Sequence, residues 1–218
     1  MSLFLIVLSI LSTIALLVGV LSALAPTRVA YTESVDVRAG PRDIFDDIRI
    51  QQRLMRWSAW PKETRSKCAV DPGPTGKDGE EGSRCVFLSN GKEIGHQRIT
   101  KMVDQREVAL SLEGPGPPHR PSLKFELEPL DDTTTRVKLH FVNELPRPFN
   151  AIWHFGGLTK WTRKMHRADL DGLKAFSEPP HRDIDGRVVG RQPELENPYE
   201  VALPGAGRKA MTVAIASP

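Results

Sequence analysis

The chain has few cysteines, and they form no metal-binding pattern. Cys68 and Cys85 are the only two among 218 residues, and neither belongs to a CxxC pair or a Cys/His cluster, which argues against a structural zinc site. In an oxidising compartment the two would be able to pair, whereas two buried free thiols are the alternative. The sequence leaves both possibilities open. It predicts no metal site and no other cofactor.

Long runs of a single charge are also missing. The 30 Lys and Arg residues are interspersed with 27 Asp and Glu residues, and the net charge is +3. The chain therefore lacks the basic patch on which nucleic-acid binding depends, and nucleic acid is not a predicted partner. With 39% apolar residues, the length suits one ordinary domain with appendages.

Familiar catalytic patterns are absent as well. The sequence contains no HxH, HExxH or GxSxG motif, and residues 73–77 lack the spacing of a phosphate-binding loop. His140 is predicted on the outward face of its strand. His154 and His166, on one predicted helix, are interpreted as surface or helix-face histidines without a carboxylate partner. The residues alone therefore predict no catalytic group.

A long uncharged run occupies the N-terminus. No charged side chain occurs from Ser2 to Thr27. Its core of about 22 apolar residues, at about 1.5 Å each, would cross a hydrocarbon layer of about 30 Å. Residues 1–27 are therefore predicted to be a single-pass transmembrane anchor. A cleaved signal peptide is the alternative, with an A-x-A site at residues 23–25, but no Lys or Arg precedes the run and the run is long for an h-region.

The side of the membrane is predicted from the flanking charges. Basic residues follow the apolar run and none precedes it, which favours a cytoplasmic-facing domain by the positive-inside tendency. These residues are Arg28, Arg38 and Arg42. Because three charges set only a small bias, an extracytoplasmic domain is the rival interpretation.

Residues 28–177 have the pattern of one α+β domain. Period-two alternation from residue 29 to 38 predicts a strand, and two short amphipathic helices follow it. Half-buried antiparallel strands are predicted between residues 84 and 142, with Asn90-Gly91 as a hairpin turn. One long helix is predicted from about Asn150 to Ser177. Residues 178–218 lack sustained periodicity and are predicted to be a disordered or loosely packed tail.

Three segments of this domain carry a family resemblance. They are the strand-to-helix entry at residues 35–45, the run Trp57-Ser58-Ala59-Trp60-Pro61, and the basic closing helix that ends near Phe176. Together they resemble membrane-anchored bacterial members of the START-like superfamily, also described as SRPBCC or polyketide cyclase/dehydrase proteins. The chain departs from that pattern at Gly40 and in its long tail. The resemblance implies a helix-grip fold, in which a curved antiparallel sheet wraps around the long helix and encloses a cavity.

The implied cavity is the predicted ligand site. The candidate lining residues are apolar, and ordinary core packing is the alternative for each of them: Trp57, Trp60, Leu112, Phe125, Leu139, Phe141, Trp161 and Met165.

The leading functional hypothesis is non-catalytic binding or carriage of a hydrophobic small molecule or lipid. A membrane tether would hold the cavity where such ligands concentrate. A cyclase- or dehydratase-type enzyme acting on a bulky apolar substrate is the first alternative, and a membrane-anchored interaction module is the second. A basic stripe on the closing helix is predicted either to contact anionic headgroups or to be a solvated face. The stripe consists of Lys160, Arg163, Lys164 and Arg167.

Overall fold

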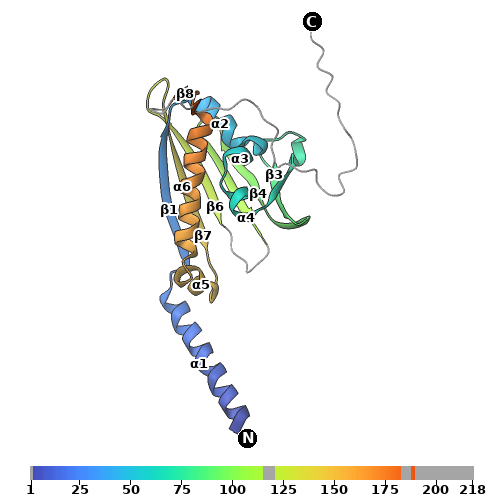
Figure 1. Cartoon of the computed structure of the whole chain (residues 1–218), viewed down its shortest axis with the longest axis vertical. Coiled ribbons are helices and arrows are strands. Elements are labelled where there is room, and N and C mark those ends of the chain that lie inside the picture. The colour runs from blue at the N-terminus through green and yellow to red at the C-terminus, as the bar shows by residue number, and fades with distance from the viewer. Residues whose placement is uncertain (1, 115–120, 183–187, 190–218) are drawn as a thin grey trace.

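A curved, seven-stranded antiparallel sheet forms the body of the protein (Figure 1). The computed structural model describes residues 2–114, 121–182 and 188–189. The sheet order is β1-β7-β6-β5-β4-β3-β2, so the first strand pairs with the last and the others follow in sequence. The strands are β1 (Arg28–Val37), β2 (Lys67–Asp71), β3 (Arg84–Ser89), β4 (Lys92–Val103), β5 (Glu107–Glu113), β6 (Ser122–Pro129) and β7 (Thr135–Glu144).

Helices pack against the concave side of this sheet. The chain begins with α1 (Ser2–Leu24), and three short helices follow β1: α2 (Pro41–Arg49), α3 (Gln51–Trp57) and α4 (Trp60–Thr64). A 3-10 turn, η1 (Gly73–Thr75), lies between β2 and β3. After β7 come α5 (Phe149–Phe155) and α6 (Leu158–Ser177). A small pair of strands, β8 (His181–Arg182) and β9 (Val188–Val189), closes the described part of the chain.

The long helix α6 packs on β1 and β7, and α2 and α3 pack against it and the sheet. Alternation of buried and less buried residues along β6 and β7 turns one face of each strand toward the core. Val137, Leu139 and Phe141 are buried on that face. The predicted helix-grip α+β fold is therefore confirmed.

The closing helix differs from the prediction, because it is two helices and not one. Gly157 has φ +77°, a left-handed conformation that favours glycine, and it ends the continuity between α5 and α6. At Gly156 a Cβ would lie 2.4 Å from the carbonyl oxygen of Ile152, so the turn also needs a residue without a side chain. His154 and His166 are thus on different helices.

Two further regions bear on the sequence predictions. Cys68 on β2 and Cys85 on β3 are buried and joined by a disulfide, which decides between the two alternatives left open by the sequence. Most of the tail predicted at residues 178–218 lies outside the described residues. Within its described part, Glu178 accepts a hydrogen bond from the Arg38 backbone and pairs with the Arg38 guanidinium.

The N-terminal helix projects away from the sheet (Figure 1). Its stretch Leu3–Leu24 is 22 residues long, and the most apolar 18-residue window within it has a mean hydropathy of 2.8 and no residue buried in the protein. By length and composition this helix can cross a membrane, and a signal sequence passes the same test. Only its C-terminal end packs on the domain, where Ser22 is buried and α1 contacts α5.

Candidate functional site

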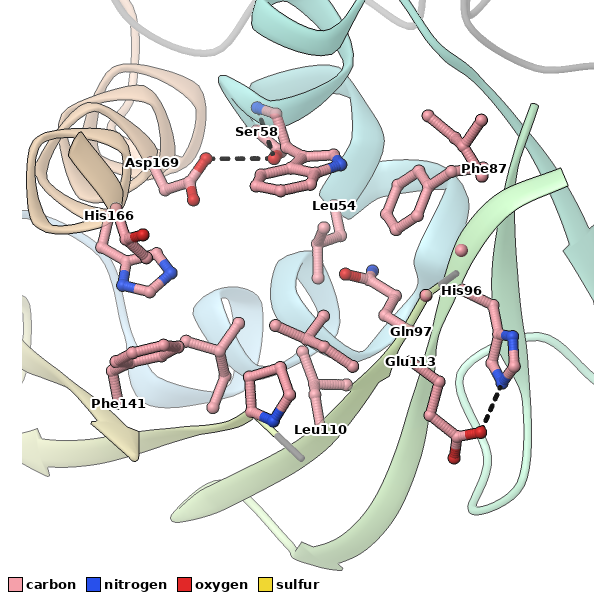
Figure 2. Close-up of a pocket in the computed structure, with 18 of the residues that line it drawn as sticks. Leu54, Ser58, Phe87, His96, Gln97, Leu110, Glu113, Phe141, His166 and Asp169 are labelled. Atoms are coloured by element: carbon pink, nitrogen blue, oxygen red, sulfur yellow. Dashed lines mark hydrogen bonds and ion pairs between the residues drawn. The ribbon is translucent and has the colours of Figure 1, made fainter. Parts of the chain in front are cut away.

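A cavity of about 260 Å³ lies between the concave face of the sheet and the helices α3, α4 and α6. Much of its wall is apolar. Figure 2 shows Leu110 and Phe141 along the sheet, with Leu54 and Phe87 opposite and beside them. Such concave, mostly apolar spaces with a few polar groups are the usual form of small-molecule sites.

Six of the eight predicted lining residues border this cavity: Trp57, Trp60, Leu112, Phe125, Phe141 and Trp161. Leu139 and Met165 are buried in the protein without lining it. Leu139 lies on β7, and α6 packs directly on this strand. The aromatic residues also touch one another, with the Trp60 ring 5.8 Å from Trp161 and 6.2 Å from Phe87.

One end of the cavity is polar, and the sequence analysis missed it. His166 and Asp169 project from α6 into the open space, and Ser58 lies across from Asp169 (Figure 2). The interpretation of His166 as a surface histidine was wrong, since its side chain is buried and lines the cavity.

His166 is held in place by Tyr31 on β1. The Tyr31 Oη and His166 Nδ1 atoms are 2.9 Å apart, and the two rings also pack against Phe141. Burial disfavours the charged imidazolium and lowers the pKa of His166 to about 4, although the nearby Glu33 carboxylate opposes this shift. At neutral pH this histidine is therefore an uncharged hydrogen-bonding group inside the cavity.

Asp169 is held by the turn between α3 and α4. Its Oδ1 accepts hydrogen bonds from Ser58 Oγ at 3.0 Å and from the Ala59 amide at 2.7 Å. Burial raises the pKa of Asp169 to about 6, while these two hydrogen bonds to the carboxylate oppose the rise. A carboxyl group that titrates near pH 6 in an apolar space is suited to recognising a polar group or to moving a proton.

Further polar groups lie elsewhere on the wall. The Trp60 indole N–H is buried and donates to no group in the described part of the chain. Gln97 is buried and donates from Nε2 to Gln51 Oε1 at 2.7 Å. His96 and Glu113 lie at the far side, with Nε2 and Oε2 3.5 Å apart, and the exposed Glu113 marks the rim (Figure 2). A ligand that carries polar groups fits this distribution better than a pure hydrocarbon.

The basic stripe predicted on α6 is partly occupied by an ion-pair network. Arg163 and Arg167 both donate to the carboxylate of Glu33 on β1. Although burial acts in the opposite direction, these hydrogen bonds hold the pKa of Glu33 below its usual value. The two arginines thus fasten α6 to the sheet. Across residues 2–114, 121–182 and 188–189, no cluster of three or more His, Cys, Asp or Glu side chains has the arrangement of a metal site.

No family model and no curated protein sequence matches the chain. Several solved structures are similar in fold. A hypothetical protein from Helicobacter pylori aligns with a TM-score of 0.51 and 14% identity over 69% of this chain and 88% of its own. A protein from Nitrosospira multiformis gives 0.49 and 19% over 68% and 96%. Norcoclaurine synthase from Thalictrum flavum gives 0.46 and 11% over 68% and 94%. At these identities the likeness concerns the fold, and the START-like family stays a prediction.

Proposed function

We propose that the protein binds an apolar small molecule or a single lipid chain in this cavity while tethered to a membrane by α1. The observation that carries the proposal is the cavity itself, which is apolar over most of its wall and polar at His166 and Asp169. Its volume of about 260 Å³ lies just below the usual range of ligand sites, which is about 300–1,000 Å³. This size favours a compact ring compound or one chain over a two-chain lipid.

The junction between α1 and the domain supports an anchor that is retained. Asn150 is 0% exposed, donates from Nδ2 to the carbonyl oxygens of Ser22 and Ala25, and accepts from Ser22 Oγ. Cleavage at the A-x-A site would remove Ser22 and leave a buried amide with lost partners, at a cost of about 1–3 kcal/mol. The contact therefore favours the anchor over a cleaved signal peptide.

The side of the membrane has two opposed indications. Arg28, Arg38 and Arg42 favour the cytoplasmic side, as the sequence analysis predicts. The Cys68–Cys85 disulfide favours an oxidising compartment, because cytosolic thiols are kept reduced. A buried covalent bond weighs more than a bias of three charges, so we propose that the domain faces the extracytoplasmic side.

Ligand binding is tested with the full chain purified in a mild detergent. Native mass spectrometry and solvent extraction are expected to reveal an apolar compound bound at one per chain. The variant Leu112→Trp, which adds volume at the cavity wall, is expected to lose most of it, whereas Leu130→Trp at an exposed site away from the cavity keeps it. Folding of both variants is checked by circular dichroism. A wild-type protein that stays empty after exposure to fatty acids, isoprenoids and phospholipids would refute the proposal.

Acid–base catalysis is the second candidate, and a specific observation favours it. His166 and Asp169, three residues apart on α6, both line the cavity with displaced pKa values. A dehydratase would convert a bound hydroxy compound into a product lighter by one water. Mass spectrometry of the bound compound over time distinguishes the two functions, since a carrier releases it unchanged. If conversion occurs, Asp169→Asn is expected to abolish it while retaining binding.

A further inference from the structure

An exposed apolar face lies on the short helix α5. Phe149, Ile152 and Phe155 are 38%, 62% and 55% exposed. Their spacing of three residues places them along one side of the helix. The opposite side is packed into the protein, where Asn150 and Ala151 are buried. Three large apolar side chains on two turns of helix form a patch that needs a partner.

The position of α5 indicates what that partner is. Asn150, in the first turn of α5, is hydrogen-bonded to Ser22 and Ala25 at the C-terminal end of α1. Because Ser22 lies within the apolar stretch Leu3–Leu24, α5 is held beside the last turn of the candidate membrane span. Figure 1 shows α5 at the end of the domain from which α1 projects. Arg147, just before α5, donates from Nε to the Ser22 carbonyl oxygen and adds a cation at this level.

The same helix borders the cavity. Trp153 of α5 and Trp161 at the start of α6 both line it, and Trp161 is also partly exposed at the surface. A molecule that leaves a bilayer at α5 would thus have a path along aromatic side chains toward the site at His166. Tryptophan side chains favour the membrane–water interface, because one end of the ring is apolar and the other carries a polar N–H group.

We propose that α5 is a second membrane contact, in which Phe149, Ile152 and Phe155 enter the lipid interface and place the cavity beside the bilayer. The occupant of this surface is the lipid bilayer itself. The inference rests on the proposed function, because it requires α1 to be the anchor. It adds that the domain does not hang freely from α1 but is seated on the membrane in one orientation, with its ligand entrance at the lipid surface.

The test uses the full chain reconstituted in phosphatidylcholine nanodiscs. Lipids brominated near the headgroup end of the acyl chain quench tryptophan fluorescence by contact. Trp153 and Trp161 are expected to be quenched several-fold more strongly than in discs with bromine at the chain end. Ile152→Asp is expected to remove most of this quenching. The matched control Leu130→Asp alters another exposed apolar side chain, at the β6–β7 turn and far from α5 along β7, and is expected to leave the quenching unchanged.

The outcomes separate this inference from the function on which it rests. A chain that does not incorporate into discs refutes the anchor, and a chain that incorporates but binds no apolar compound refutes the ligand proposal. Full incorporation with equal quenching for wild type and Ile152→Asp refutes the membrane contact of α5. Weak quenching combined with two chains in each disc would assign the apolar face to a second copy, which also overturns the proposal.

Discussion

Burial displaces the pKa values of His166 and Asp169 in opposite directions. Between about pH 4 and 6.5 the unfolded chain protonates His166 and the folded chain does not, so this residue destabilises the fold as the pH falls. Between about pH 3.8 and 6 the folded chain keeps the Asp169 proton that the unfolded chain loses, so this residue stabilises the fold as the pH falls. The two contributions offset each other in the wild-type protein.

Substituting each residue separately is expected to reveal its own contribution to the pH dependence of stability. Relative to wild type, His166→Gln should become progressively more stable as the pH falls from 6.5 to 4, and Asp169→Asn progressively less stable from 6 to 4. Each slope is at most about 1.4 kcal/mol per pH unit, the value for one proton. Denaturant titrations in detergent at several pH values measure both, and each variant is the control for the other. Parallel pH profiles for all three proteins would contradict the assignment.

The sequence predicted the apolar wall of the cavity better than its polar end. Trp57, Trp60 and Phe125 line the cavity, and they could be predicted because large aromatic residues are usually buried. His166 was misplaced because it was interpreted from the lack of a carboxylate partner at a useful spacing, and that observation does not tell whether the side chain is buried. Tyr31, which contacts His166, is distant from it in sequence, so no local sequence pattern predicts the contact.

At the scale of elements, the close approach of α6 to α3 depends on a glycine. A Cβ at Gly172 would lie 2.3 Å from the carbonyl oxygen of Trp57, a backbone atom that cannot move aside alone. Gly to Ala in a helix ordinarily stabilises by up to about 1 kcal/mol. Here Gly172→Ala is expected to destabilise by about 1–3 kcal/mol through overpacking, and thermal melting measures the sign. Gly40→Ala, where a Cβ meets nothing within 4 Å, is the control expected to change little.

Strands were easier to predict than helix boundaries for a related reason. Alternation along β6 and β7 reports directly on one buried face, so their positions follow from residue type. The break between α5 and α6 depends on Gly157, which has φ +77°, and on Gly156, where a Cβ would lie 2.4 Å from the carbonyl oxygen of Ile152. The amphipathic pattern continues on both sides of the break, which is why a single helix was predicted.

The contact between α1 and α5 depends on the side chain of Asn150. Asn150→Ala removes the three hydrogen bonds that join this side chain to Ser22 and Ala25. Loss of these bonds in a buried position is expected to destabilise the packed junction by about 1–3 kcal/mol. Faster hydrogen exchange of the α5 amides in nanodiscs, with the β6 amides unchanged, would be the readout. Equal exchange in both proteins would show that the junction is not held by this residue.

The cavity lies toward one side of the molecule. On the β1–β7 side α6 lies directly on the sheet and is fastened by the Glu33 pairs with Arg163 and Arg167. Toward β4 and β5, side chains of α3 and α4 such as Trp60 join those of α6 around an open space, and the cavity is found there. The strong curvature of the sheet was implied by the family resemblance, whereas the location of the cavity required the packing of α6 to be known.

The orientation of the whole molecule across the membrane depends on Cys68 and Cys85. If the domain is extracytoplasmic, rapid alkylation of denatured cells should find both thiols blocked, and prior reduction should release two per chain. Reduction is expected to lower the melting temperature, because the disulfide cross-links β2 to β3 and a cross-link limits the entropy of the unfolded chain. Cys68→Ala/Cys85→Ala is the control, with no thiol signal and a melting temperature insensitive to reductant. Two free thiols in freshly trapped cells would instead place the domain in the cytoplasm, as Arg28 and the other flanking charges predict.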